Sequence, residues 1–481
     1  MKSISGWLRP PRILKKVAFF ELINKDIQQC VVTDTSIIQL LQNIPIESIV
    51  QISGTMQPSK SIKHKEEWLV SNINVINSCK DLPFDPRSAV EPHEIINRQT
   101  LRYVHLRNPK LQHDLRLRSN INFKVRQYLI ENEFVEIETP TLFKPTSEGA
   151  NEFLVPKDDT FYALTQSPQQ FKQLLMVGGF QKYFQIAKCY RNEDHRADRQ
   201  PEFTQIDLEL SFTSETEIKT LVKDLLKVAF STANLKLDEF VEMSYKDAML
   251  RYGCDKPDIR LPYSLITKGK LQILTLPKAD LNLNTFLRDL DIPFNESHDS
   301  LIFIQNLSIL DNNPSDTPVG RMLRLLVSLH LKKPLTGFKP VWITDFPLFK
   351  MSKTGIKSCH HPFTRPKSGL SMNLENKMKE LGSCFDVVIN GNELASGSMR
   401  IHEPELQTKI FDILELTEHQ KSQFSHLIDG LGSGCPPHGG IAIGLDRLMA
   451  IICNESSIQQ VIAFPKASNG RDLCFGSPAS K

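Results

Sequence analysis

Short apolar runs separated by polar turns mark the first eighty residues of the chain. Each run is rich in β-branched or aromatic residues, as strands are. The runs are SGWLR, KVAFFEL, QQCVVTD, SIVQISGTM and WLVSNINVI. Five short strands in so few residues predict a small closed barrel, and the OB-fold is the commonest such barrel that also binds single-stranded nucleic acid. A barrel that only packs is the plainer interpretation.

Two adjacent aromatic residues, Phe19 and Phe20, lie in the second of these runs. Neighbouring side chains of a strand point to opposite faces. We therefore expect one ring in the barrel core and the other outside, free to stack on a base.

Helical spacing begins after a proline-marked linker over residues 81–112. The helix runs straight into FVEIETP, an alternating strand that ends at Pro140. Its apolar residues are Leu117, Ile121, Val125, Tyr128 and Leu129. A second helix is predicted after Ser214, where Glu217 completes a capping box.

Two apolar strands flank a heavily charged loop between these helices. KYFQIAK (182–188) leads into CYRNEDHRADRQPEF, and FTQIDLEL (203–210) follows. In the second strand Phe203, Gln205 and Asp207 alternate with apolar residues. The strand should therefore present one apolar face and one face lined by amide and carboxylate groups.

The remaining chain alternates weak and strong patterns. Residues 256–340 hold short mixed segments with Asn, Asp and Pro clusters, which predict an inserted subdomain. CFDVVINGNEL then predicts a strand reaching an Asn390-Gly391 turn, and GGIAIGLDRLMAII predicts a strand that enters a helix. The whole pattern predicts an α+β protein, with domains over 1–80, 113–255, 256–340 and 341–481.

Composition narrows the class of protein. The chain has 481 residues, of which 40% are hydrophobic and 23% charged, the balance of a soluble protein with two or three domains. No segment approaches the apolar length that spans a bilayer, so no membrane partner is expected. A net charge of +3 means that nucleic-acid binding must rest on local patches and stacking. Nine cysteines without a C-x-x-C pair argue against a zinc ribbon or a disulfide framework.

Two arginines stand in comparable settings, each at the end of a strand. Arg191 and Arg447 can meet phosphate oxygens there in bidentate geometry. Glu193 adds an acceptor for an amine donor, and Phe203 adds an aromatic face for a purine. The plainer interpretations are a solvated ion pair for each arginine and a core position for the phenylalanine.

Two carboxylates further along the chain, Asp386 and Glu393, could hold magnesium through their oxygens. Paired carboxylates are also often only a polar surface. Taken singly, none of these residues establishes a site.

Three motifs resemble the signatures of class II aminoacyl-tRNA synthetases. They are the helix, strand and proline that end at Pro140, the charged loop from Arg191-x-Glu193 to Phe203, and Gly444-Leu445-Asp446-Arg447. Longer strings resemble the aspartyl-tRNA synthetases of bacterial and mitochondrial type: TSEGANEFLVP, FYALTQSPQQFKQLLM, RADRQPEFTQID, HHPFT and VIAFPK. This resemblance covers nearly the whole chain. It implies an OB-fold barrel that binds the anticodon, then an antiparallel catalytic sheet flanked by helices, with a short inserted subdomain.

The resemblance implies a ligase reaction in two steps. L-aspartate attacks the α-phosphate of ATP, giving aspartyl-adenylate and pyrophosphate, and the 3′ end of tRNA(Asp) then takes the aspartyl group. The protein's work is positioning and charge neutralisation. Mg²⁺ bound with ATP by Asp386 and Glu393 is implied, as is a homodimer built on Pro140 and the helix before it.

The family's motifs assign roles at the ATP end of the site. Arg191 would bridge the substrate carboxylate and the α-phosphate, and Arg447 would meet the γ-phosphate. Glu193 would accept a hydrogen bond from the adenine amino group, and Phe203 would stack on the ring. Glu393 belongs to the ATP site as well as to the metal.

Lys172 and Arg400 are implied on the side-chain carboxylate of aspartate. A site built for a buried carboxylate leaves its charges unmet when a neutral amide binds. The other implied aspartate residues are Glu148, Gln169, Gln205, Asp207, His360 and His361. The two histidines match a mobile loop that closes over the substrate, although exposed histidines could equally be bystanders. In the barrel, Phe19 matches an anticodon-stacking aromatic residue and Gln29 an anticodon-reading amide.

The alternation of side chains between the two faces of a strand provides a check on these assignments. Phe203, Gln205 and Asp207 share a face, whereas Glu393 and Arg400 do not. Both of the latter can face the site only if their strand is irregular, and we predict a glycine bulge near residues 396–397. The string ELASGS also departs from the family's usual glycine-rich E-x-GGGS, which could change the shape of the aspartate pocket.

Three alternatives differ in what they explain. An asparaginyl-tRNA synthetase shares the fold, but QSPQQFKQ with Lys172 favours the acidic substrate. A catalytically inactive, synthetase-like RNA-binding factor would be expected to lose Arg191, Glu193 or Arg447. A DNA-binding OB protein explains only residues 1–80, so no DNA partner is expected. The short insertion favours a reduced enzyme of the mitochondrial matrix, with the cytoplasm as the alternative.

Overall fold

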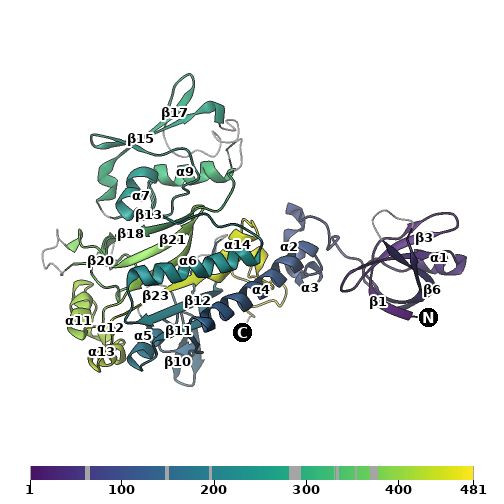
Figure 1. The fold of residues 1–481 in the computed structure, drawn as a ribbon, viewed down its shortest axis with the longest axis horizontal. Helices are drawn as coiled ribbons and strands as arrows, with labels where there is room; N and C mark the ends of the chain where they lie inside the picture. Colours follow the sequence, from purple (N-terminus) through teal and green to yellow (C-terminus); the bar gives the residue numbers. More distant parts are fainter. Residues whose placement is uncertain are drawn as a thin grey trace. The chain divides into compact units, whose positions relative to one another are not determined.

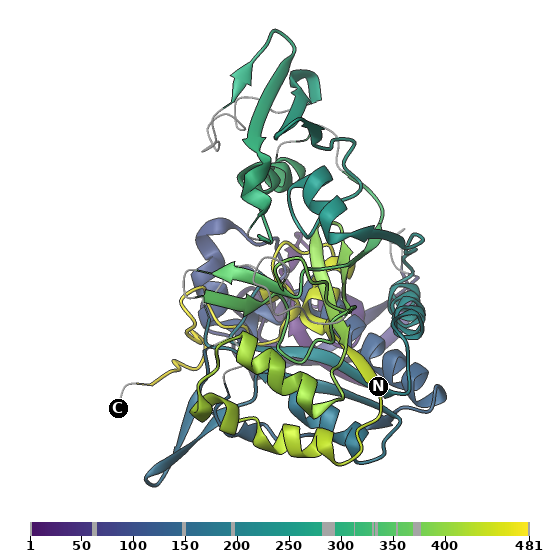
Figure 2. The same cartoon turned by 90° about the vertical axis from the view of Figure 1, so that its left-hand side faces the viewer.

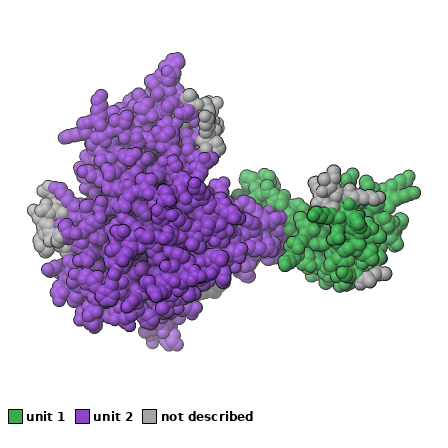
Figure 3. Space-filling view, viewed as in Figure 1, with its two compact units in different colours: residues 1–98 green, residues 99–481 purple. Residues whose placement is uncertain are grey.

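The chain forms two compact units, residues 1–98 and 99–481, which Figure 3 shows in different colours. The computed structural model describes residues 2–59, 65–146, 151–193, 198–280, 294–311, 313–329, 331, 335–352, 355–368 and 377–479. Each unit has its own hydrophobic core. Among the described residues, no helix is long and apolar enough to cross a membrane.

The first unit is a closed barrel of five strands (Figure 1). They are β1 (Lys2–Leu8), β3 (Ala18–Ile23), β4 (Ile27–Val32), β5 (Ile49–Pro58) and β6 (Glu66–Asn77), with the short β2 (Arg12–Ile13) paired to β3. The spatial order is β1-β5-β6-β4-β3, and β1 also pairs with β3 to close the barrel. A helix, α1 (Thr35–Gln42), connects β4 to β5. The five apolar runs form these strands, so the predicted OB-like barrel is confirmed.

Three short helices precede the long helix of the second unit: η1 (Pro92–Glu94), α2 (Ile95–Thr100) and α3 (Arg102–His105). The long helix is α4 (Pro109–Glu131). Asn108 caps α4, because its side chain accepts hydrogen bonds from the backbone N–H groups of Lys110 and Leu111. A proline at the first helical position suits this start, since its missing N–H would have no partner there.

A large mixed sheet forms the centre of the second unit. Its order is β13 (Val241–Ser244), β18 (Pro340–Thr344), β21 (Cys384–Ile389), β22 (Asn392–Met399), β23 (His438–Gly444), β12 (Glu202–Ser211), β11 (Lys182–Tyr190) and β7 (Val135–Glu136). Only the outermost pairs, β13 with β18 and β11 with β7, are parallel. The antiparallel catalytic sheet implied by the motifs is therefore present.

Helices cover both faces of this sheet (Figure 1). α4, α6 (Glu215–Thr232) and α14 (Leu445–Ile452) contribute to one continuous core with the strands. On the other face lie α5 (Gln169–Val177), α11 (Pro404–Ile413), α12 (Glu418–Ser422) and α13 (Ser425–Gly432). The alternation in β12 follows from this arrangement: Ile206 and Leu208 enter the core beneath α6, while Asp207 and Glu209 face the α5 side.

A smaller sheet occupies part of the region expected to be inserted. It runs β14 (Ile266–Lys268), β15 (Leu271–Pro277), β17 (Ser300–Asn306) and β16 (Asn295–Glu296), with α7 (Tyr245–Tyr252), α9 (Pro318–Leu329), η2 (Lys278–Asp280) and η3 (Leu307–Leu310) nearby in the chain. Figures 1 and 2 show it standing at the β13 and β18 end of the large sheet. The remaining strands are β8 (Leu142–Phe143), β9 (Leu154–Lys157), β10 (Thr160–Leu164), β19 (Phe349–Ser352) and β20 (Gly355–Ser358), and η4 (Ile458–Val461) follows α14.

Local predictions are mostly confirmed. Ser214 and Glu217 form the predicted capping box of α6. Asn390 and Gly391 adopt positive φ values of 52° and 79° in the turn between β21 and β22. The strand expected in FVEIETP is shorter, because only Val135 and Glu136 pair with β11 at the edge of the sheet.

The irregularity predicted in β22 is confirmed, but its predicted position was wrong. Val387 lies opposite Ala395, whereas Val388 lies opposite Glu393, so Leu394 is the extra residue. Gly397 lies instead in regular pairing, where an added Cβ would come within 2.7 Å of the Gly440 carbonyl oxygen. The bulge buries Leu394 and lets Glu393 share the cavity with Arg400.

One buried carboxylate links three elements of the second unit. Asp446, in the first turn of α14, accepts a hydrogen bond from Arg118 of α4 (2.5 Å) through Oδ1 and another from the backbone N–H of Thr204 in β12 (2.8 Å) through Oδ2. We expect Asp446→Ala to lower the free energy of unfolding by about 2–4 kcal/mol, because both donors lose a buried acceptor. Denaturant unfolding followed by circular dichroism measures this change.

The matched control is Asp412→Ala, which removes an ion pair to Lys421 at the surface. Little change is expected there, since exposed ion pairs contribute little. Equal effects of the two substitutions would contradict the linking role of Asp446.

Candidate active site

The polar face of the large sheet lines a cavity of about 520 Å³. Twelve residues singled out from the sequence line it together: Gln169, Lys172, Arg191, Glu193, Phe203, Gln205, Asp207, His360, His361, Glu393, Arg400 and Arg447. Asp386 is buried beside the cavity, 3.8 Å from the imidazole of His360. Glu148 lies outside the described residues. Residues spread over more than 270 positions of sequence thus meet at one place.

One end of the cavity combines an aromatic ring with cations. The guanidinium carbon of Arg191 lies 5.0 Å from the centre of the Phe203 ring. The two are close because β11 and β12 pair with Cys189 opposite Phe203. Glu193 accepts a hydrogen bond from Arg199 at 2.9 Å. This end can therefore receive a flat ring and negative charge side by side.

Arg447 lies near the same end, at the start of α14. Its guanidinium donates to the backbone carbonyl of Glu393 and lies 3.3 Å from Asp198. Asp446, the residue before it, ties α14 to β12, so the backbone beside Arg447 is held close to the strand that carries Phe203.

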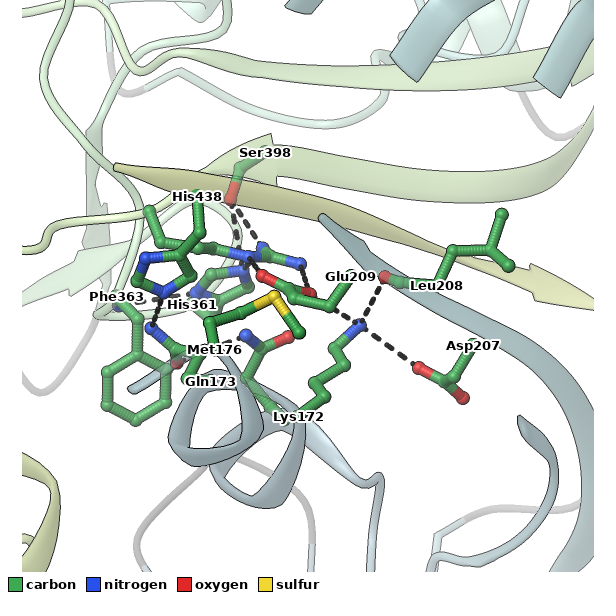
Figure 4. Close-up of polar contacts among 12 residues, drawn as sticks. Lys172, Gln173, Met176, Asp207, Leu208, Glu209, His361, Phe363, Ser398 and His438 are labelled. Atoms are coloured by element: carbon green, nitrogen blue, oxygen red, sulfur yellow. Dashed lines mark hydrogen bonds and ion pairs between the residues drawn. The ribbon is translucent and has the colours of Figure 1, made fainter. Parts of the chain in front are cut away.

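A buried cluster of four charges forms the opposite end (Figure 4). Lys172 Nζ lies 3.1 Å from Asp207 Oδ1 and 3.3 Å from Glu209 Oε2. Arg400 binds the same Glu209 carboxylate, with Nε 2.9 Å from Oε1 and a terminal nitrogen 3.2 Å from Oε2. Charges of opposite sign therefore alternate from Asp207 to Arg400, which buried charges require.

Glu209 is the central residue of this cluster, and the sequence analysis did not assign it to the site. Burial by itself raises the pKa of Glu209, but the charges of Arg400 and Lys172 outweigh burial and lower this pKa. The available signal was parity, because Glu209 continues the polar face of Phe203, Gln205 and Asp207.

Asp207 has an open acceptor. Its Oδ1 meets Lys172, whereas its buried Oδ2 has no hydrogen-bond partner among the described residues. Burial raises the pKa of Asp207, although the Lys172 charge partly opposes this. A bound ammonium group would satisfy Oδ2, since a buried carboxylate oxygen without a donor is costly.

The two histidines are half-buried in the cavity wall. Arg400 donates to His361 Nε2 at 2.5 Å, and burial together with that positive charge lowers the pKa of His361. His360 Nδ1 lies 3.1 Å from the hydroxyl of Ser396, and burial lowers the pKa of His360 to about 4. Both rings are neutral near pH 7.

A chain of side-chain hydrogen bonds supports the end of the cavity that holds Lys172 and Arg400. Gln169 Nε2 donates to Gln173 Oε1 at 3.1 Å, and Gln173 Nε2 donates to His438 Nε2 at 3.2 Å. His438 Nδ1 donates in turn to the Pro436 carbonyl at 2.8 Å, which fixes its tautomer. Gln173 and His438, both missed from the sequence, hold Gln169 at the cavity wall.

The two predicted metal carboxylates lie in different settings: Glu393 lines the cavity, and Asp386 is buried beside it. Asp386 Oδ1 is buried and has no hydrogen-bond partner in the part of the chain that the structure describes, and burial together with the charge of Glu393 raises the pKa of Asp386 well above its ordinary value. The described residues hold no group of three or more metal-ligating side chains. Mg²⁺ commonly binds one or two carboxylates together with substrate phosphates, so this pair fits an ion that arrives with a nucleotide.

The barrel of the first unit brings together the two residues that the sequence singled out there. Phe20 is 2% exposed in the core, and Phe19 faces outward, as predicted. Gln29 lies opposite Glu21 in the β3–β4 ladder, so Phe19, Glu21 and Gln29 share the outer face. An aromatic ring and an amide side by side are suited to stacked, unpaired bases.

Comparison with known proteins identifies the family. The sequence profile of the tRNA synthetases class II (D, K and N) matches residues 95–468. The chain belongs to the class II tRNA synthetases. Every cavity residue named above lies within the matched range.

Two curated relatives and one solved structure illustrate the likeness. The mitochondrial aspartate–tRNA ligase of Schizosaccharomyces pombe is 39% identical, over 93% of this chain and 84% of the relative. The aspartate–tRNA(Asp/Asn) ligase of Dictyoglomus turgidum is 34% identical, over 99% of this chain and 93% of the relative. The crystal structure of asparaginyl-tRNA synthetase from Pyrococcus horikoshii, complexed with asparaginyl-adenylate, covers 96% of this chain and 94% of its own at a TM-score of 0.67. Its 16% identity supports the shared fold alone.

The buried charge cluster of this synthetase generates a stability prediction. Glu209→Gln is expected to lower the free energy of unfolding by about 3–5 kcal/mol, because Lys172 and Arg400 lose their shared carboxylate. The double variant Glu209→Gln with Arg400→Met should lose less than the sum of the two single changes, as measured by denaturant unfolding.

The control is Glu239→Gln, since Glu239 binds Lys223 at the surface (2.6 Å) and should contribute little. Additive losses in the double variant would show that Glu209 and Arg400 do not depend on each other.

Proposed function

We propose that this protein is an aspartate–tRNA ligase, which activates L-aspartate with ATP and transfers it to the 3′ end of tRNA(Asp). The observation that carries the proposal is the pair of buried cations, Lys172 and Arg400, at one end of a cavity whose other end holds Arg191 and Phe203. The names and 34–39% identities of the curated relatives support the same function.

The aspartate end would bind both charged ends of its substrate. Lys172 and Arg400 would meet the side-chain carboxylate, and the open Oδ2 of Asp207 would accept from the α-ammonium group. Gln169 and Gln205 add amide groups on the same wall. Asparagine would present a neutral amide to Lys172 and Arg400 and would therefore lose the charge-assisted hydrogen bonds that the aspartate carboxylate makes there.

The nucleotide end would bind ATP through stacking and charge. Phe203 would stack on the adenine ring, Glu193 would accept from its amino group, and Arg447 would bind the γ-phosphate. Arg191 now lies over the Phe203 ring and would turn to the α-phosphate and the substrate carboxylate. Mg²⁺, if held by Asp386 and Glu393, would neutralise charge on the phosphates.

The first step needs no nucleophile from the protein. An oxygen of the aspartate α-carboxylate forms a bond to the α-phosphorus, and the oxygen that joins it to the β-phosphate leaves with the electron pair as pyrophosphate. Arg191 would neutralise the charge that grows on the α-phosphate oxygens. In the second step the terminal hydroxyl of the tRNA attacks the acyl carbon, and AMP leaves.

The same cavity bears on the two alternative functions. Two buried cations at the amino-acid end favour a carboxylate side chain over the neutral amide that an asparaginyl-tRNA synthetase binds. An inactive RNA-binding factor has no need of Arg191, Glu193 and Arg447 around one cavity. Both alternatives are therefore less well supported than aspartate activation.

A homodimer built on α4 and Pro140 is part of the proposal. Phe123 and Ile130 of α4 expose 64% and 58% of their surface, unusual for large apolar side chains of a helix. The mitochondrial matrix is the proposed compartment, supported by the S. pombe relative, while the D. turgidum relative suits the cytoplasmic alternative.

ATP–pyrophosphate exchange tests the proposed chemistry. Exchange is expected with aspartate and not with asparagine, and Arg191→Ala should lower kcat/KM about 100-fold or more, since it removes charge stabilisation at the reacting phosphate. The control Lys227→Ala changes an exposed lysine that lies 3.7 Å from Glu239, outside the cavity. Exchange with asparagine, or with neither amino acid, would contradict the proposal.

Aminoacylation tests the role of the barrel. Phe19→Ala should raise the KM for tRNA(Asp) about tenfold, because a base loses a stacking partner worth about 1–3 kcal/mol, while ATP–pyrophosphate exchange stays unchanged. Assaying Gln29→Ala on tRNA(Asp) and tRNA(Asn) examines anticodon reading. Equal loss of both reactions in Phe19→Ala would instead indicate a folding defect.

A further inference from the structure

Three buried side chains connect the start of β23 to the wall of the cavity. Gln169 and Gln173 lie one turn apart on α5, and His438 is the first residue of β23. Their exposed fractions are 8%, 0% and 1%, and Figure 4 shows Gln173 and His438 next to each other. Water does not reach such positions, so the polar atoms of these side chains need partners within the protein.

The direction of the hydrogen bonds is set at Pro436. Its carbonyl oxygen can only accept, so His438 Nδ1, which lies 2.8 Å away, carries a proton. Burial lowers the pKa of His438 and outweighs the opposite effect of the Glu209 charge, so the ring is neutral near pH 7. A neutral imidazole has one proton only, and His438 Nε2 therefore accepts.

Two glutamine amides carry this direction from His438 to the cavity. Gln173 Nε2 donates to His438 Nε2 at 3.2 Å, which leaves Gln173 Oε1 to accept from Gln169 Nε2 at 3.1 Å. The two ends of an amide have nearly the same shape, so hydrogen bonds and not packing choose its orientation. Here they turn the nitrogen of Gln169 toward Gln173. The oxygen of Gln169 has no donor in the described part of the chain and is the end available to a ligand in the cavity.

The orientation of Gln169 matters because a second open acceptor lines the same cavity. Asp207 Oδ2 is buried without a hydrogen-bond partner among the described residues. Lys172, one turn from Gln169 on α5, binds the other oxygen of that carboxylate. An ammonium group has three donors and no acceptor, so two such oxygens suit it. A reversed Gln169 amide would present N–H groups to the ammonium, and the contact would be repulsive.

We propose that His438 and Gln173 are positioning residues, which fix the amide of Gln169 so that its oxygen faces the α-ammonium group of the amino-acid substrate. The inference rests on the proposed function, since it concerns how aspartate is held. Neither residue touches the substrate, because each acts through the next side chain of the chain of hydrogen bonds. Preference for an amino acid over a simple dicarboxylate then depends on residues behind the cavity wall.

Titration calorimetry of the full chain with L-aspartate and with succinate tests this inference. Succinate has both carboxylates of aspartate and lacks the ammonium group. Gln173→Met and His438→Phe keep most of the side-chain volume and break the chain of hydrogen bonds. Each should weaken aspartate about tenfold or more, the loss of one hydrogen bond to a charged group, and change succinate less than about twofold. The double variant should weaken aspartate no more than either single change, because both break the same chain.

Gln272→Met is the matched control. Gln272 is also 0% exposed and hydrogen-bonded at both ends of its amide, but it lies in β15 and does not line the cavity. Its Nε2 donates to the carbonyls of Met249 and Leu250, and its Oε1 accepts from Gln305 at 2.7 Å. This change should lower stability and leave the ratio of the two affinities unchanged.

Exchange kinetics provide a second measurement. In ATP–pyrophosphate exchange, Gln173→Met should raise the KM for aspartate about tenfold with a smaller change in kcat, the pattern of a lost binding interaction. This measurement also decides the matter where succinate binds too weakly to titrate. Gln173→Met decides it if the histidine variant does not fold.

The outcomes separate this inference from the function on which it rests. Wild-type protein that shows no exchange with aspartate overturns the proposed function. Active wild-type protein overturns this inference alone if Gln173→Met keeps the wild-type KM for aspartate, or if kcat falls as much as KM rises. Equal weakening of aspartate and succinate also overturns it, because a general change in the shape of the cavity would then explain the loss.

Discussion

The site depends on one buried carboxylate, that of Glu209. Lys172 comes from α5 and Arg400 follows β22, and each would carry an uncompensated charge into the protein interior without Glu209. With Glu209 between them, both cations have a buried carboxylate partner, and both line the cavity. The same carboxylate leaves Asp207 only partly engaged, with one oxygen open to a ligand. The proposed recognition of an acidic amino acid therefore depends on how this cluster balances its own charges.

In the large sheet, one face packs in the core and the other lines the cavity, because neighbouring side chains of a strand point to opposite faces. Alternate residues of β12 enter the core beneath α4 and α6, and the residues between them form the polar wall of the cavity. β22 achieves the same separation only through the bulge at Leu394, which brings Glu393 to the side of Arg400. A regular strand would have placed Glu393 and Arg400 on opposite faces.

At the other end of the cavity, around Arg191 and Phe203, the charged side chains are more exposed than in the cluster around Glu209. Cations and carboxylates there lie partly exposed, and several pair with one another: Arg199 with Glu193, Arg447 with Asp198, and Lys256 with Glu393. Such pairs are weak enough to exchange partners when a highly charged ligand arrives. The end of the cavity around Glu209 is therefore built in advance, whereas the end around Arg191 and Arg447 is held by ion pairs that a charged ligand can replace.

Local sequence determined the strands of the barrel, the capped helices, the Asn390-Gly391 turn and the polar face of β12, because each depends on side-chain period or on a turn residue within a few positions. The resemblance of the long motifs to aspartyl-tRNA synthetases predicted most of the cavity residues. Only the tertiary structure decided the roles of Glu209, Gln173 and His438, since each acts through a partner at least 35 positions away or through burial. It also decided where β22 bulges: Leu394 is the extra residue and is buried, whereas Gly397 lies in regular pairing.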